Sequence, residues 1–327
     1  MSVSAQPPKV GEINFYGLRK LPPDKILSVL DLKSGDPLPA SKGDLEDRLE
    51  LLPGVAAAHV EAVCCEGPDA ILFIGIEERG AAHFDTRQPP PGTVTLPEDI
   101  MAAYQEYVGA VEVAAQIGTA GEDLTSGESH MFDAAARPLE ERFTALALDR
   151  MELLRDVLRN GADAGERAVA AAVIGYAPGK EEVIKDLQFA LQDAEPAVRA
   201  NAVRALMAIA VFSQKHPDRG LRIESTWMVE MLNSLVLSDR QQAARALVAL
   251  SERRDPATLG LIRTRALPAL VEMARWKTLG FALPAFLLVG RTAGVPETEL
   301  LEQWKRGDRE TAIELATAPP AKARRGK

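Results

Sequence analysis

One segment in the second half of the chain recurs at a spacing that restricts the fold more than any other feature. RANAVRAL at 199–206 returns as RQQAARAL at 240–247, and RAVAAAVI at 167–174 aligns with both. Across residues 193–211, alanine, valine and leucine recur at helical spacing, and the small side chains allow a neighbouring helix to approach closely. Repeats of about 32–47 residues that each hold two helices are typical of an α-solenoid. The sequence therefore predicts a stack of paired helices in this half.

Composition limits the classes of protein that remain. The chain has 327 residues, 46% of them hydrophobic, which is enough for two domains with separate cores. Aromatic residues make up only 5%, which favours alanine-rich helical packing over a β-sandwich. The formal net charge of −9 opposes binding to phosphate backbones, so nucleic acid is not an expected partner. No apolar run reaches the length of about 18 residues that a membrane span needs.

Residues 10–80 predict a small domain with the order strand, helix, helix, strand, strand. The last strand, Ala70–Glu77, is apolar on both faces, which places it in the middle of a sheet. The preceding strand, Val55–Cys65, is expected at an edge from Ala58 onward, where unpaired backbone groups can receive another strand. The residues expected to contact such a strand are His59, Val60, Glu61 and Val63.

The apolar and glycine positions of this domain resemble the POTRA (polypeptide-transport-associated) family. The resemblance spans about 70 residues and rests on Ile13, Phe15, Gly17, Leu18, Leu30, Gly35, Leu45, Leu52, Gly54, Val55, Leu72, Ile74, Ile76 and Glu77. It implies an exported protein that works beside a membrane, binds other polypeptides partly by strand addition, and is not an enzyme. Val3-Ser4-Ala5 also has the small-x-small pattern that precedes a signal-peptidase cut. The expected location is the periplasm or another exported site, where a partner could be membrane-associated; the cytoplasm is the alternative.

The middle of the chain predicts a connector. Residues 81–97 are rich in proline, which is typical of an extended, semi-stiff linker. Helices are expected over 98–160, interrupted by a polar, glycine-rich loop at 118–130. Two interpretations of this loop are open: its carboxylates and histidine could bind a metal ion or serve acid–base chemistry, or its polar residues could cap the flanking helices. The candidates for a metal site are Glu122, Asp123 and His130. No HExxH, CxxC or GxSxG motif is present, and no cofactor is expected.

The segment DAEPAVRANAVRAL at 193–206 resembles the HEAT repeat, and repeats of this kind are predicted over 161–317. In that family an arginine pairs with an aspartate inside the stack, which implies structural roles for Arg199 and Arg240. Successive repeats create a long concave surface that suits a peptide or the flank of a protein. The candidate binding residues on that surface are Asn201, Arg204, Gln241 and Gln242.

These features together predict an α+β chain. A small β-α-α-β-β POTRA-like domain is followed by an all-α, HEAT-like, right-handed solenoid, with short tails at 1–9 and 318–327. The expected function is a non-enzymatic scaffold or adaptor that binds proteins or peptides by strand addition and along the helical surface. Two alternatives remain: a metal-dependent or hydrolytic activity at the 118–130 loop, and a cytoplasmic helical-repeat protein that handles nucleic acid.

Overall fold

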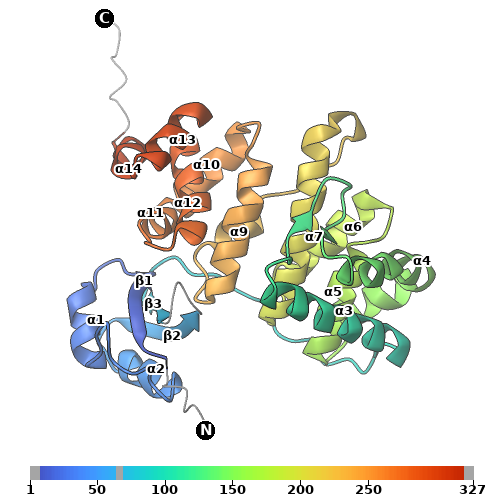
Figure 1. Ribbon diagram of the computed structural model, residues 1–327, viewed down its shortest axis with the longest axis horizontal. Helices are drawn as coiled ribbons and strands as arrows, with labels where there is room; N and C mark the ends of the chain where they lie inside the picture. The colour runs from blue at the N-terminus through green and yellow to red at the C-terminus, as the bar shows by residue number, and fades with distance from the viewer. Residues whose placement is uncertain (1–7, 64–68, 320–327) are drawn as a thin grey trace, which may run out of the picture. The chain divides into compact units, whose positions relative to one another are not determined.

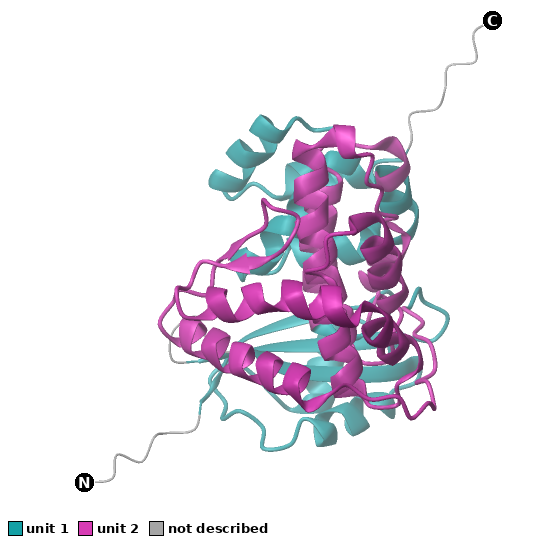
Figure 2. Ribbon diagram, turned by 90° about the vertical axis from the view of Figure 1, so that its right-hand side faces the viewer, with its two compact units in different colours: residues 1–83, 235–237, 259–327 teal, residues 84–234, 238–258 magenta. Residues whose placement is uncertain are grey.

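The computed structural model describes residues 8–63 and 69–319, and these form two compact units (Figure 2). The first unit combines the chain up to His83 with residues 235–237 and with the C-terminal segment from Leu259. The second unit holds residues 84–234 and 238–258. The tails predicted at 1–9 and 318–327 fall mostly outside the described residues, as do Cys64 and Cys65 at the end of the predicted edge strand.

The N-terminal part of the first unit is a three-stranded mixed sheet with two helices (Figure 1). Its elements are β1 (Val10–Tyr16), α1 (Pro23–Leu30), α2 (Gly43–Glu50), β2 (Val55–Val63) and β3 (Ala70–Glu78). Strand β3 lies in the middle, parallel to β1 and antiparallel to β2. The predicted element order, the central position of β3 and the edge position of β2 are confirmed.

The two faces of this sheet pack against different helices. On one face, Leu72, Ile74 and Ile76 of β3 form a core with the apolar residues Ile26, Leu30, Leu45 and Leu49 of α1 and α2. On the other face, the Phe73 ring lies 5.0 Å from that of Trp276 and 5.7 Å from that of Phe281, measured between ring centroids. The continuous apolar run of β3 is therefore buried on both sides, by segments from opposite ends of the sequence.

The segment around Trp276 belongs to the C-terminal helices of the first unit. They are α10 (Pro256–Arg265), which begins in the second unit, then α11 (Leu267–Ala274), α12 (Leu279–Thr292), α13 (Glu297–Lys305) and α14 (Glu310–Thr317). The indole Nε1 of Trp276 donates to the carbonyl of Phe15 at 3.1 Å. Glu272 accepts from the amide of Gly17 at 3.0 Å and forms an ion pair with Arg19. The sheet predicted as a separate domain thus shares a unit with these helices.

The second unit is helical apart from one short hairpin. Its helices are α3 (Glu98–Gln116), α4 (Ala136–Asn160), α5 (Ala164–Ile174), α6 (Lys180–Ala190), α7 (Pro196–Lys215), α8 (Thr226–Met231) and α9 (Leu237–Leu250). Between α3 and α4, strands β4 (Glu122–Asp123) and β5 (His130–Met131) form the hairpin within the predicted polar loop. Across the described residues, no helix combines the length and hydrophobicity that crossing a bilayer would need.

Short breaks separate several of the helices. Helix α8 ends at Met231, and α9 begins at Leu237. Helices α10 and α11 are divided at Ala266, because Pro268 in the first turn of α11 has no amide hydrogen to continue the ladder. The proline-rich segment predicted as an extended linker contacts α6, where the guanidinium of Arg87 lies 3.6 Å from the centre of the Phe189 ring.

Buried arginines join successive helix pairs in the second unit. The Arg167 guanidinium donates two hydrogen bonds of 2.9 Å to Asp193, and that of Arg199 donates to Asp239 at 2.7–3.1 Å. Each arginine also donates to backbone carbonyls five and six residues before it, which caps the preceding turn. Arg240 donates in the same way to the Ser234 carbonyl at 2.5 Å. The prediction that Arg199 pairs with an aspartate is confirmed.

Candidate functional site

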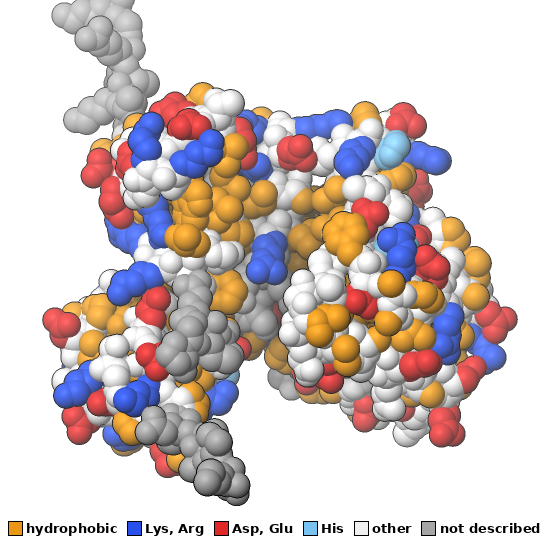
Figure 3. Space-filling view, in the orientation of Figure 1, with side chains coloured by type: hydrophobic (Ala, Val, Ile, Leu, Met, Phe, Trp, Pro, Cys, Tyr) orange, Lys and Arg blue, Asp and Glu red, His pale blue; other side chains and the backbone are white. Residues whose placement is uncertain are grey.

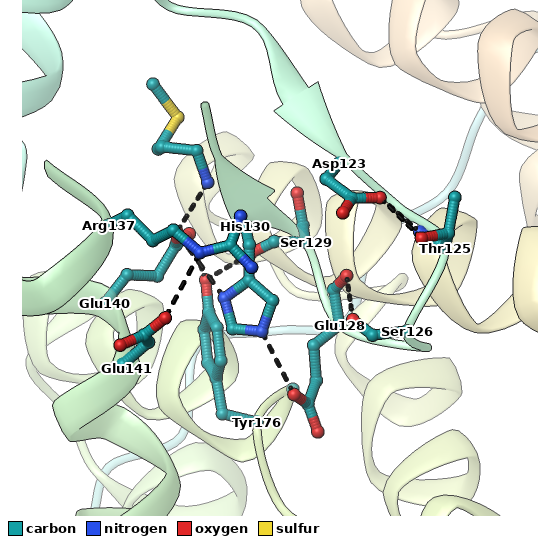
Figure 4. A network of polar contacts seen from close by, with 12 residues as sticks. Asp123, Thr125, Ser126, Glu128, Ser129, His130, Arg137, Glu140, Glu141 and Tyr176 are labelled. Atoms are coloured by element: carbon teal, nitrogen blue, oxygen red, sulfur yellow. Dashed lines mark hydrogen bonds and ion pairs between the residues drawn. The ribbon is translucent and has the colours of Figure 1, made fainter. Parts of the chain in front are cut away.

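A buried carboxylate, Glu140 of α4, organises the polar groups beneath the β4–β5 hairpin (Figure 4). It accepts hydrogen bonds from the Tyr107 hydroxyl at 3.0 Å, the Met131 amide at 2.7 Å and the Arg204 Nη2 at 2.6 Å. The Tyr176 hydroxyl is a further donor to it. Because these donors come from α3, the hairpin, α7 and the end of α5, one side chain holds four parts of the unit together.

His130 lies between two carboxylates in the same network (Figure 4). Its Nε2 is 3.2 Å from Glu128 Oε2, and its Nδ1 is 3.8 Å from Glu140 Oε2. The hydrogen bond with Glu128, helped by the charge of Glu140, raises the pKa of His130 to about 9. Burial disfavours the Glu140 carboxylate, but the surrounding His130, Tyr176 and Arg204 outweigh that effect and lower the pKa of Glu140 to about 2. Both groups are therefore charged at neutral pH.

These pKa values favour a structural role for the loop. A general base works best when its pKa lies near the operating pH, and a carboxylate with a pKa of about 2 is a weak proton acceptor. Glu122 is held by Arg204, and Asp123 accepts from the amide and hydroxyl of Thr125 at 2.9 and 2.7 Å. In the part of the chain that the structure describes, no three His, Cys, Asp or Glu side chains gather closely enough to hold a metal ion.

The charge network makes stability depend on pH in a defined direction. Because the pKa of His130 is raised from 6.5 to about 9, its contribution is complete below about pH 6.5 and is lost as pH rises through 9. Because the pKa of Glu140 is lowered from 4.5 to about 2, its contribution is complete above about pH 4.5 and is lost as pH falls toward 2. We expect a stability maximum between pH 4.5 and 6.5, measured by thermal denaturation.

The variant His130→Gln provides the control for this pH dependence. It removes the titrating imidazole, so the decrease in stability as pH rises through 9 should become smaller. The decrease in stability as pH falls toward 2 should persist. An unchanged alkaline limb in this variant would show that another group is responsible.

A groove beside the hairpin collects several of the predicted binding residues. It has a volume of about 260 Å³ and lies between α7 and α9, with Glu122 of the hairpin in its wall. Its lining residues are Glu122, Val203, Arg204, Met207, Ser238, Gln241, Gln242 and Arg245. Of the four residues predicted on the helical surface, Arg204, Gln241 and Gln242 meet here. Asn201 does not line this groove; its amide donates to Tyr104 at 3.2 Å and to the Ala168 carbonyl at 2.8 Å.

The groove has an apolar side, one buried hydrogen-bond donor without a partner in the described chain, and one exposed arginine. Val203 and Met207 of α7 supply the apolar side chains. The Nε2 atom of Gln241 is buried and has no hydrogen-bond partner among the described residues. The side chain of Arg245 is exposed, one helical turn further along α9. A buried donor without an acceptor is costly, so a bound segment that supplied an acceptor would be stabilised here.

The predicted strand-addition edge is β2, and the structure shows that it is partly occupied. The amide of Ala58 donates to Glu50 Oε1 at 3.1 Å, and the amide of Val60 donates to Glu46 Oε1 at 2.7 Å. The Val60 side chain is fully buried in the core, so only its backbone faces outward. Nδ1 of His59 also lies 3.2 Å from Glu46. An incoming strand would have to displace both glutamates of α2.

Removing these glutamates is expected to open the edge. In the double variant with Glu46→Ala and Glu50→Ala, the amides of Ala58 and Val60 lose their acceptors, and their hydrogen exchange should accelerate by at least about tenfold. Association between copies through the exposed edge, measured by sedimentation velocity at high protein concentration, should also increase.

The matched control replaces Asp44 and Asp47, two exposed acidic residues of the same helix, with alanine. It removes the same charge and should leave exchange and association unchanged. Equal behaviour of the two double variants would show that the glutamates do not protect the edge.

No protein-family model matches the chain, and no curated protein matches it. The proposed function is therefore derived from the residues and the geometry described above.

Proposed function

We propose that this protein is a non-enzymatic scaffold that binds extended polypeptide segments in the groove between α7 and α9. The observation that carries the proposal is the convergence of apolar side chains, an exposed arginine and a buried unmet donor at one place, on the two helices that contain the recurring sequence segment. Enclosed sites for small molecules usually measure about 300–1,000 Å³ and bury most of their ligand. At about 260 Å³, this groove is better suited to a few side chains of a longer chain.

The two resemblances support the same class of function. A HEAT-like, right-handed solenoid would present the groove as part of a longer concave surface, and a POTRA-like domain would offer β2 as a second contact by strand addition. The second contact would require displacement of Glu46 and Glu50 from the edge amides. The POTRA resemblance also favours an exported, periplasmic location for the scaffold.

The distribution of charge is consistent with a protein partner. On the face drawn in Figure 3, basic and acidic side chains are interspersed, with hydrophobic side chains exposed between them. A mixed surface of this kind suits a polypeptide better than a phosphate backbone, which is bound through clustered positive charge.

Selection from a displayed library of random peptides tests the proposal. We expect the wild-type chain to enrich a family of related peptides. Met207→Trp should lose them, because the larger side chain fills the groove between α7 and α9. Met101→Trp is the matched control, since Met101 is also partly exposed and lies on α3 outside the groove lining. A failure to enrich any family, or equal enrichment by Met207→Trp, would contradict the proposal.

A further inference from the structure

We infer that the α7–α9 groove selects segments that carry an internal aspartate or glutamate beside an apolar residue. This inference rests on the proposed function and adds the chemistry of the partner. It follows from the charges in the groove wall, from the spacing of two donors on α9, and from the apolar residues opposite them on α7.

Among the residues that the structure describes in the groove wall, the charges leave one cation available. The ionisable residues of the lining are Glu122, Arg204 and Arg245. Glu122 and Arg204 form an ion pair with each other, and Arg204 is also bound to the buried Glu140. The exposed guanidinium of Arg245 is thus the remaining charged group of the lining. On a chain with a net charge of −9, this is a local positive site that attracts a carboxylate.

Two donors on α9 match a carboxylate in spacing. Gln241 and Arg245 are four residues apart on one helix, so their side chains lie on the same face, with Cβ atoms about 5–6 Å apart. The buried Nε2 of Gln241 needs an acceptor, and guanidinium groups bind carboxylates through paired hydrogen bonds. One carboxylate with two oxygens could serve both donors, whereas a single backbone carbonyl would leave Arg245 without a counter-charge.

The apolar residues across the groove predict what accompanies the carboxylate. Val203 and Met207 lie on α7, opposite the donors on α9. In an extended segment, alternate side chains point to the same face, so residues two apart can enter the groove together. The preferred segment is therefore acidic–any–apolar, with the acid against α9 and the apolar side chain against Val203 and Met207.

Fluorescence anisotropy with defined peptides and the full chain tests this inference. The probes are labelled, amidated peptides with one extended sequence that carry Glu, Gln or Lys at a single position, two residues before a leucine. We expect the Glu peptide to bind at least about tenfold more tightly than the Gln peptide, and the Lys peptide to bind most weakly. Arg245→Glu should abolish the preference for Glu over Gln, and Gln241→Leu should reduce it.

Arg306→Glu is the matched charge reversal. Arg306 directly follows α13 in the first unit, is exposed and does not line the groove, so this variant should keep the wild-type preference. Equal binding of the Glu and Gln peptides, or a Glu preference that survives Arg245→Glu, would overturn the inference. A Gln peptide with a free C-terminus that bound more tightly than the amidated Glu peptide would also overturn the inference, because the groove would then prefer a terminal carboxylate.

These failures can be distinguished from failure of the proposed function. The library selection places no condition on peptide charge, so enrichment of neutral or basic families would preserve the scaffold and remove only the acidic preference. An absence of any enriched family would remove both.

Discussion

Replacing Glu140 with alanine is expected to destabilise the second unit by about 3–5 kcal/mol, the usual cost of removing one partner from a buried charge pair. The variant leaves Arg204 and the hydroxyls of Tyr107 and Tyr176 without their shared acceptor in a buried site. The β4–β5 hairpin also loses the bond from the Met131 amide. Urea denaturation followed by circular dichroism measures the change.

The neighbouring residue supplies the control for this experiment. Glu141 is exposed and pairs with the partly exposed Arg137, so Glu141→Ala should change the free energy of unfolding by less than about 0.5 kcal/mol. A loss below about 1 kcal/mol in Glu140→Ala would show that the network does not hold the hairpin in place.

Replacing Trp276 with alanine is expected to destabilise the first unit by about 3–5 kcal/mol, which is typical of removing a buried aromatic side chain. Trp276 is 3% exposed and packs edge-on against Tyr16 and Phe73 of the sheet. Its loss opens a cavity between β3 and the C-terminal helices and removes the bond to the Phe15 carbonyl. Thermal denaturation and hydrogen exchange of β3 amides measure the effect.

Leu279→Ala provides a comparison nearby in the chain. Leu279 begins α12 and is 57% exposed, so its truncation should cost little. Similar losses in the two variants would mean that the sheet does not depend on the C-terminal helices.

The order and pairing of the first five elements followed from local patterns. The continuous apolar run of β3 indicated a central strand, and the sheet order places it between β1 and β2. The same run did not reveal what covers its second face. That cover comes from Trp276 and Phe281, about two hundred residues later in the chain, and neither hydrophobic period nor turn residues encode such a long-range contact.

Two features of the candidate sites could not be predicted from residue patterns. Glu140 lies in the apolar stripe of α4, between Ala136 and Phe143, and a carboxylate in that position was the one available signal of a buried network. The protection of the β2 edge depends on Glu46 and Glu50 reaching across from α2, which requires the tertiary packing. In contrast, Arg204, Gln241 and Gln242 lie in the sequence segment that recurs at 199–206 and 240–247, and all three line one groove.

The network and the groove are physically connected through Arg204. Its guanidinium binds the buried Glu140 on one side and Glu122 of the groove wall on the other. The buried charges therefore hold Arg204 and Glu122 in the groove wall, and under the proposed function a change in the network would alter the binding of a segment.

Site-specific photocrosslinking with a selected peptide shows where on the chain the peptide binds. A photoreactive phenylalanine analogue is placed at Gln242, in the groove lining, or at Lys185, which is exposed on α6, and mass spectrometry identifies the adduct. If the α7–α9 groove binds the segment, we expect an adduct with the peptide from position 242 and none from position 185. Crosslinking from position 185 without crosslinking from position 242 would show that the peptide binds elsewhere.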